Sequence, residues 1–139
     1  MQQLDLIADR LDSLPDAIKQ AQEKALEEAG AAVLERVRVG IGGSGRIAGV
    51  QAVHMGSKGG YIAVRAKAKT DVVNRGKKQT RYPAGYVTNA LEHGHNVRGG
   101  SSRVAGKYMY AGAVATAAEQ ARSLQQRVLQ TAQDHLNGD

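Results

Sequence analysis

The sequence contains no cysteine, phenylalanine or tryptophan, and it has only two prolines. The absence of cysteine excludes disulfides, thiolate metal ligands and cysteine nucleophiles. The first residues show no basic stretch followed by an apolar run, and no segment approaches the roughly 20 apolar residues of a membrane-spanning helix. We therefore expect a protein that stays in the cytoplasm until it is used and that has no membrane partner.

Acidic residues are scarce in the middle of the chain. Residues 1–39 hold eight acids and five bases (net −3), residues 40–110 hold two acids and twelve bases (net +10), and residues 111–139 hold three acids and two bases (net −1). A central segment this basic favours a polyanion or an acidic protein surface as its neighbour. The alternative is a basic face that serves only solubility.

Aromatic residues are limited to five tyrosines, so the core must be built from small aliphatic side chains. Hydrophobic residues make up 42% of the sequence, and 17 residues are glycine. The 139 residues suffice for about one domain, which we place over residues 1–139. A core of alanine and valine is thin, and a thin core often gains further burial in an oligomer.

Two long helices are predicted. Ser13 is a suitable cap for a helix from Pro15 to Arg38, in which apolar residues recur at spacings of three, four and seven. The spacing of Leu4, Ile7, Leu11 and Leu14 suits a shorter amphipathic helix before it, and an extended start of this piece is the alternative. A second, alanine-rich helix should run from Tyr108 to about Asn137, with Val114, Ala117 and Ala121 on one apolar face, and Gly138 is placed to end it.

The clearest strand pattern lies at residues 61–69, after a strand-compatible segment at residues 47–55. Successive side chains of a strand point to opposite faces. Ile62, Val64, Ala66 and Ala68 should therefore face a core, while Arg65, Lys67 and Lys69 form a basic stripe on the other face. Because the helices do not alternate with single strands, the predicted fold class is α+β. The long N-terminal and C-terminal helices should pack on a small antiparallel sheet.

Two basic, glycine-containing segments, at about residues 70–81 and 96–107, lack apolar periodicity and are predicted to be flexible loops. Together with the basic stripe, the first loop supplies a surface for DNA or for an acidic partner. The residues of this predicted surface are Arg65, Lys67, Lys69, Arg75, Lys77, Lys78 and Arg81.

Between the two predicted loops, the segment from Tyr82 to His95 holds two of the five tyrosines. A tyrosine ring offers a large apolar body with a polar tip, so clustered tyrosines favour a contact surface. At its end we expect Gly94 to supply an unusual backbone angle. The segment is therefore predicted to be an ordered part of a binding surface.

Neither catalysis nor metal binding is favoured. The glycine-rich tract at residues 40–46 lacks the spacing of a phosphate-binding loop, and the two acids of the central segment, Asp71 and Glu92, have no partner carboxylate there. His93 and His95 beside Glu92 would suit zinc, but a glycine turn explains the pattern better. We predict no enzyme activity, no cofactor and no metal.

Five features follow one another in a recognisable order. They are the helix from Pro15 to Arg38, the turn Ser44-Gly45-Arg46-Ile47, the segment from Tyr86 to Gly94 with its Glu92, the loop from Asn96 to Lys107, and Tyr108-Met109-Tyr110-Ala111 leading into the last helix. In this order the chain resembles, over nearly its whole length, the small minor tail or tail-completion proteins of tailed bacteriophages and prophages.

The resemblance implies a non-enzymatic virion protein of the tail or the head-tail junction. Such a protein would form a homo-oligomeric ring around the DNA path and contact neighbouring tail or connector proteins. Subunit or partner contacts would involve Tyr82, Tyr86, Glu92, Tyr108 and Tyr110.

A second interpretation is a free-standing protein that binds nucleic acid without sequence specificity. The basic residues would then contact phosphates, and Tyr82 or Tyr86 would stack on bases.

Overall fold

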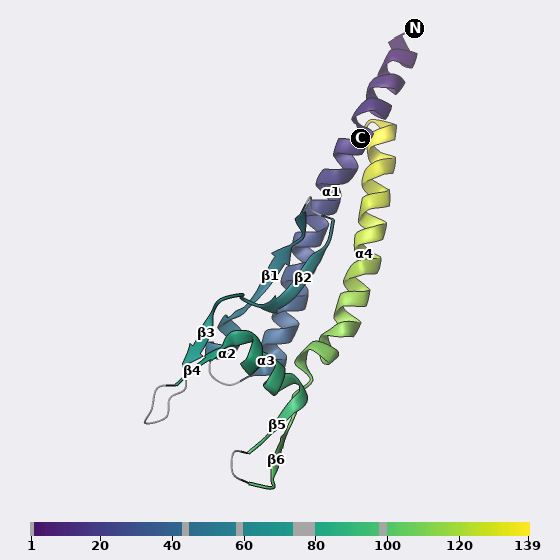
Figure 1. Ribbon diagram of the computed structural model, residues 1–139. Helices are drawn as coiled ribbons and strands as arrows, with labels where there is room; N and C mark the ends of the chain where they lie inside the picture. Colours follow the sequence, from purple (N-terminus) through teal and green to yellow (C-terminus); the bar gives the residue numbers. More distant parts are fainter. Residues whose placement is uncertain (1, 43–44, 58–59, 74–79, 98–99) are drawn as a thin grey trace.

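The computed structural model describes residues 2–42, 45–57, 60–73, 80–97 and 100–139. Helices α1 (Gln2–Ile41) and α4 (Met109–Asn137) lie side by side along most of α4, and the molecule is elongated along their common direction (Figure 1). This arrangement confirms the predicted α+β class, with the long N-terminal helix packed against the long C-terminal helix. The shorter elements are α2 (Gly45–Gly49), β1 (Gln51–Met55), β2 (Ile62–Ala66), β3 (Asp71–Val73), β4 (Arg81–Pro83), α3 (Ala84–His93), β5 (Gly94–Asn96) and β6 (Arg103–Ala105).

The strands form three separate antiparallel pairs where one small sheet was expected. β1 pairs with β2 from Gln51 opposite Ala66 to Met55 opposite Ile62, β3 pairs with β4, and β5 pairs with β6. Only the β1–β2 hairpin lies along α1 (Figure 1). The two long helices therefore pack against each other, and the β1–β2 hairpin lies beside α1.

Helix α1 begins well before Pro15, which lies in its interior, so the predicted helix start was wrong. The Ser13 hydroxyl donates to the Asp9 carbonyl at 2.9 Å and does not cap a new helix. Contacts with the end of α4 hold this part of α1, since Arg10 donates to the Leu136 carbonyl at 3.3 Å. The apolar spacing of residues 4–14 continues in phase into the following turns, which explains why one helix forms where two were predicted.

At its other end, α1 runs one turn beyond the predicted Arg38 and stops at Gly42, whose φ is +62°. Val37 and Ile41 are both buried in the core, and their burial extends the helix to Ile41. The strand-compatible segment at residues 47–55 is also split. Its first part belongs to the short helix α2, and only Gln51–Met55 is extended.

Strand β2 is shorter than the predicted residues 61–69, so the expected alternation ends at Ala66. Ala68 is exposed and not part of the core, and Lys69 has a φ of +53° in a turn. The described residues of the two predicted basic loops also include strands. The ends of these predicted loops pair as β3 with β4 and as β5 with β6. Strands pair through main-chain hydrogen bonds, which do not require apolar periodicity in the sequence.

The main core cluster lies where the carboxyl end of α1 meets the amino end of α4. It consists of Val37, Ile41, Met109 and Ala113, with further half-buried aliphatic residues around it. Helix α4 begins within one residue of the predicted position and ends at Gly138, which adopts the left-handed conformation, as predicted. This cluster joins the two long helices at one end, and the contacts of Arg10 and Ser13 with the end of α4 join them at the other.

Candidate functional site

A buried carboxylate joins α3 to the start of α4. Glu92 is only 8% exposed, and its two oxygens accept hydrogen bonds from the main-chain amides of Tyr110 (2.9 Å) and Ala111 (3.1 Å). These amides lie in the first turn of α4, where helix geometry leaves N–H groups without partners and where the helix dipole favours negative charge. Glu92 was expected at a subunit surface, but the structure gives its carboxylate this role within the chain.

Two glycines let the chain cross itself next to Glu92. The amide of Lys107 donates to the Leu91 carbonyl at 2.8 Å, and the amide of Tyr108 donates to the Glu92 carbonyl at 3.2 Å. Gly94 has a φ of +84°, which confirms the predicted unusual angle, and a Cβ there would lie 2.5 Å from the Val104 carbonyl oxygen. A side chain at Gly106 would meet the Glu92 carbonyl in the same way. The crossing fixes the position from which Glu92 reaches α4.

Gln51 extends this junction into the molecule. It is fully buried, and its amide nitrogen donates to the Thr88 hydroxyl at 2.8 Å, while the Tyr110 hydroxyl is hydrogen-bonded to its amide oxygen. Burial raises the pKa of Tyr110 above its usual value, and the negative charge of Glu92 adds to this effect. These polar groups bond one another, and the junction joins β1, α3 and the start of α4.

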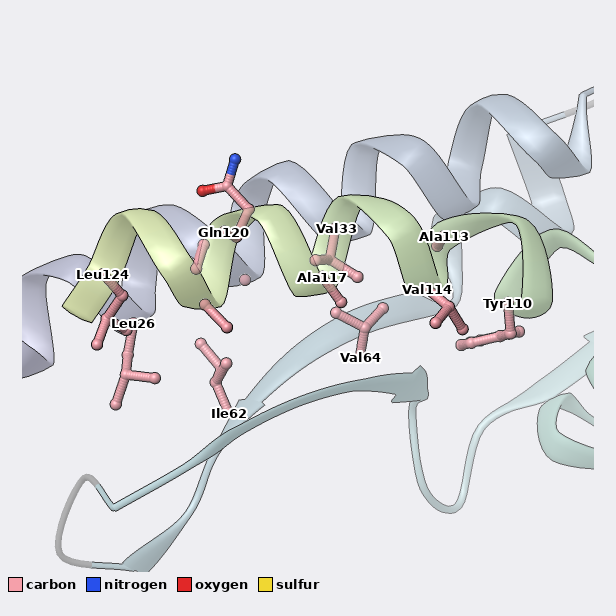
Figure 2. A pocket seen from close by; sticks show the side chains of 13 residues that line it. Leu26, Val33, Ile62, Val64, Tyr110, Ala113, Val114, Ala117, Gln120 and Leu124 are labelled. Carbon is pink, nitrogen blue, oxygen red and sulfur yellow. The ribbon is translucent and has the colours of Figure 1, made fainter. Parts of the chain in front are cut away.

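An open apolar groove of about 340 Å³ runs between α1, α4 and the β1–β2 hairpin (Figure 2). We call it the central groove. Figure 2 shows Ile62 and Val64 of β2 directed toward α4, as the alternation predicted for the inner face of that strand. Ala117 and Val114 line it from α4 and are exposed, although both were expected within a buried or alanine-rich packing face. The two helices therefore leave an apolar surface uncovered.

A second hollow, of about 630 Å³, lies at the end of the molecule that carries β3 to β6. We call it the tyrosine hollow; it is lined by Ile47, Tyr82, Tyr86, Val87, Leu91 and Val97, among others. The rings of Tyr82 and Tyr86 stack with their centroids 6.2 Å apart, and Tyr86 is 66% exposed. The segment singled out in the sequence thus forms helix α3 and presents two rings at its amino end.

The other predicted interface residues divide into two kinds. Tyr108 is exposed and takes a left-handed conformation just before α4. Tyr110 is half-buried and belongs to the Gln51 junction together with Glu92. Sequence reasoning missed the central groove. Since Val114, Ala117 and Ala121 were predicted as one helical face, the missing information was that no element among the described residues covers that face.

The predicted basic surface is brought together only in part. Arg65 is exposed on β2, Lys67 and Lys69 are exposed beyond its end, and Arg81 is exposed on β4. Arg75, Lys77 and Lys78 lie outside the described residues. No alternating stripe extends past Ala66, because the strand ends there.

The described residues contain neither a metal-binding cluster nor a membrane-spanning helix. In the described ranges, no group of three or more His, Asp or Glu side chains is placed to hold a metal ion, and His93 and His95 are both exposed. None of the helices in these ranges has the length and hydrophobicity needed to span a bilayer. Comparison with known proteins gave no match to a family profile, to a curated protein or to a solved structure.

Proposed function

We propose that this protein is a structural subunit of the bacteriophage tail or head-tail junction, a minor tail or tail-completion component that works as an oligomer around the DNA path. It would act in the virion after synthesis in the host cytoplasm. The proposal starts from the order of motifs in the sequence. Three features of the molecule support it: its surface area, its construction around Glu92 and its distribution of charge.

Surface area is the observation that carries the proposal. The chain exposes 9832 Å². A compact monomer of 14.7 kDa exposes about 6,900 Å². The excess of about 2,900 Å² is of the size that permanent oligomers bury between subunits. Part of the exposed surface is apolar, since the central groove and the tyrosine hollow are both open and lined mainly by apolar side chains.

The junction around Glu92 gives a physical reason for the motif on which the resemblance depends. In that motif a glutamate precedes a glycine by two positions, and here Glu92 caps α4 while Gly94 lets the chain cross. Any protein that holds its last helix in this way needs an acid and a glycine at these positions. The motif therefore supports a shared construction, and we infer the shared assembly role from it.

The part of the sequence between α1 and α4 holds most of the basic residues, and its elements lie toward the end of the molecule opposite the two termini (Figure 1). Between residues 45 and 110, the described part of the chain holds seven bases and two acids (net +5). One of the two acids, Glu92, is buried and accepts a hydrogen bond from the start of α4. This end would face the DNA or an acidic ring in the assembled tail.

Binding to purified phage tails tests the proposal. Tails lacking their terminal components, taken from a phage whose genome encodes this chain, should capture the protein in co-sedimentation, and electron microscopy should show added density at the tail end. Intact virions serve as the control, since their sites are occupied. Failure to bind such tails, together with no rescue of head-tail joining, would overturn the proposed function.

Non-specific nucleic-acid binding is the second candidate. It is favoured by the exposed stacked rings of Tyr82 and Tyr86 next to Arg81, a combination that suits single strands. Titration of single-stranded and duplex DNA at several salt concentrations separates the two functions. A free-standing binder should bind alone, with an affinity that falls steeply with salt, whereas an assembly subunit need not bind DNA before it assembles.

A further inference from the structure

The first turns of α1 project beyond the end of α4 (Figure 1). Helix α4 ends beside Arg10, since that side chain donates to the Leu136 carbonyl and lies against Gly138. We call residues 2–11 the arm; as a helix it is about 15 Å long. Leu4, Ile7 and Leu11 share one helical face of the arm and are 65%, 50% and 54% exposed. A helix that carries apolar residues on one face gains stability when that face is covered.

Acidic residues occupy another face of the same helix. Asp5, Asp9, Asp12 and Asp16 recur at spacings of four, three and four, so they line up along α1. Residues 2–16 hold four acids and one base (net −3). These carboxylates lie on the side of the helix away from Leu4, Ile7 and Leu11, so only the net charge of the two arms, and no close contact between carboxylates, opposes pairing of one arm with another. The arm therefore suits an apolar binding site that is surrounded by basic side chains.

The tyrosine hollow, at the opposite end of the molecule, has these properties. Arg46 and Arg81 directly precede the lining residues Ile47 and Tyr82, and Arg103 lies opposite Asn96 in the β5–β6 pair. All three arginines are exposed, and among the residues that the structure describes none forms an ion pair with a carboxylate. By contrast, side chains without charge line the central groove.

We propose that the arm of one copy docks in the tyrosine hollow of a second copy. Leu4, Ile7 and Leu11 would cover the rings of Tyr82 and Tyr86, and the arginines around the hollow would attract the acidic arm. Because the two surfaces differ and lie at opposite ends, the contact is head-to-tail, and its repetition closes a ring or extends a filament. This inference rests on the oligomeric part of the proposed function and names the surfaces that form the oligomer.

Mixing two variants tests the head-to-tail contact. The arm variant carries Leu4→Ser and Ile7→Ser, and the hollow variant carries Tyr86→Ala. All three side chains are at least half exposed, so circular dichroism and the thermal midpoint should show that each variant is folded. Each variant alone should be monomeric where the wild type assembles, with association at least about thirtyfold weaker. The control Leu129→Ser removes an exposed leucine from α4 and should assemble like the wild type.

Mixed one to one, the two variants should form a dimer and nothing larger. The intact arm of the hollow variant binds in the intact hollow of the arm variant. The two surfaces left over, the substituted arm and the substituted hollow, cannot bind a further subunit. Sedimentation velocity or native mass spectrometry separates this dimer from the monomers. A pairing of identical surfaces gives a different result, because the variant whose paired surface is intact would then associate on its own.

Three outcomes overturn the inference. They are a wild type that stays monomeric at the highest concentration, a single variant that assembles like the wild type, and a mixture that remains monomeric. If Ala117→Glu in the central groove blocks assembly while Tyr86→Ala does not, the subunits associate through the central groove and not through the tyrosine hollow. The tail-binding experiment is independent of all of these, so failure here with retained tail capture would reject the arm contact and leave the proposed function standing.

Discussion

Replacement of Glu92 by alanine should destabilise the folded chain by about 2–4 kcal/mol. The substitution removes a buried carboxylate that accepts hydrogen bonds from the amides of Tyr110 and Ala111 at the start of α4. Loss of a helix cap costs about 1–2 kcal/mol, and loss of a partly buried charge from a helix amino terminus costs up to about 2 kcal/mol more. Glu92→Gln keeps one acceptor oxygen and loses the charge, so it should cost about 1–2 kcal/mol.

Urea unfolding followed by circular dichroism measures this loss. The measurement is made at two protein concentrations that differ tenfold, because an effect on subunit contacts changes with concentration whereas an effect within the chain does not. Glu119→Ala, which removes an exposed glutamate from α4, is the matched control and should change stability by less than about 0.5 kcal/mol. A Glu92→Ala protein as stable as the control would refute the capping role and return Glu92 to the predicted subunit surface.

Three further predictions concern the rest of the fold. Tyr110→Phe should cost about 1 kcal/mol near neutral pH through the lost bond to Gln51. Burial and the charge of Glu92 raise the folded-state pKa of Tyr110 above the ordinary tyrosine value of about 10, so the wild-type tyrosine keeps its proton while the tyrosine of the unfolded chain ionises. The wild type should therefore lose stability as the pH rises past 10, and the gap to Tyr110→Phe should narrow in urea titrations at pH 9 and 11; a constant gap would contradict the raised pKa. Gly94→Ala should cost at least about 2 kcal/mol, since it forces a side chain against the Val104 carbonyl at positive φ, whereas Gly85→Ala, in open space on α3, should stabilise by about 0.5–1 kcal/mol; equal effects at the two glycines would argue against the crossing. Pro15→Ala should stabilise the chain by about 1–3 kcal/mol, because α1 passes through this position as one helix, and a destabilised variant would favour a helix that starts at Pro15.

The long helices were predictable because their signals are local. The apolar spacing and the terminal Gly138 placed α4 to within one residue, and the alternation of Ile62 and Val64 identified the inner face of β2. The start of α1 was missed because Pro15 is a strong local signal for a first turn. Contacts between Arg10, Ser13 and the end of α4, more than a hundred residues away, outweigh that signal.

The candidate site was less predictable, because it depends on contacts between residues far apart in the sequence. Tyr82 and Tyr86 stood out in a sequence with few aromatic residues, and both lie at the surface. Glu92 was singled out as well, but its role depends on where the amides of Tyr110 and Ala111 come to lie, which no local pattern reveals. The arm is recognisable only once α4 is seen to end at Arg10 and to leave Leu4 and Ile7 uncovered.

The mass of the full chain in solution, measured by sedimentation equilibrium over a wide range of concentration, tests the central claim most directly. The claim is that the exposed apolar surface is covered by other copies in an assembly. The account predicts a mass that rises with concentration from the 14.7 kDa monomer to a defined multiple of it. A mass of 14.7 kDa at every concentration, up to the limit of solubility, would contradict it.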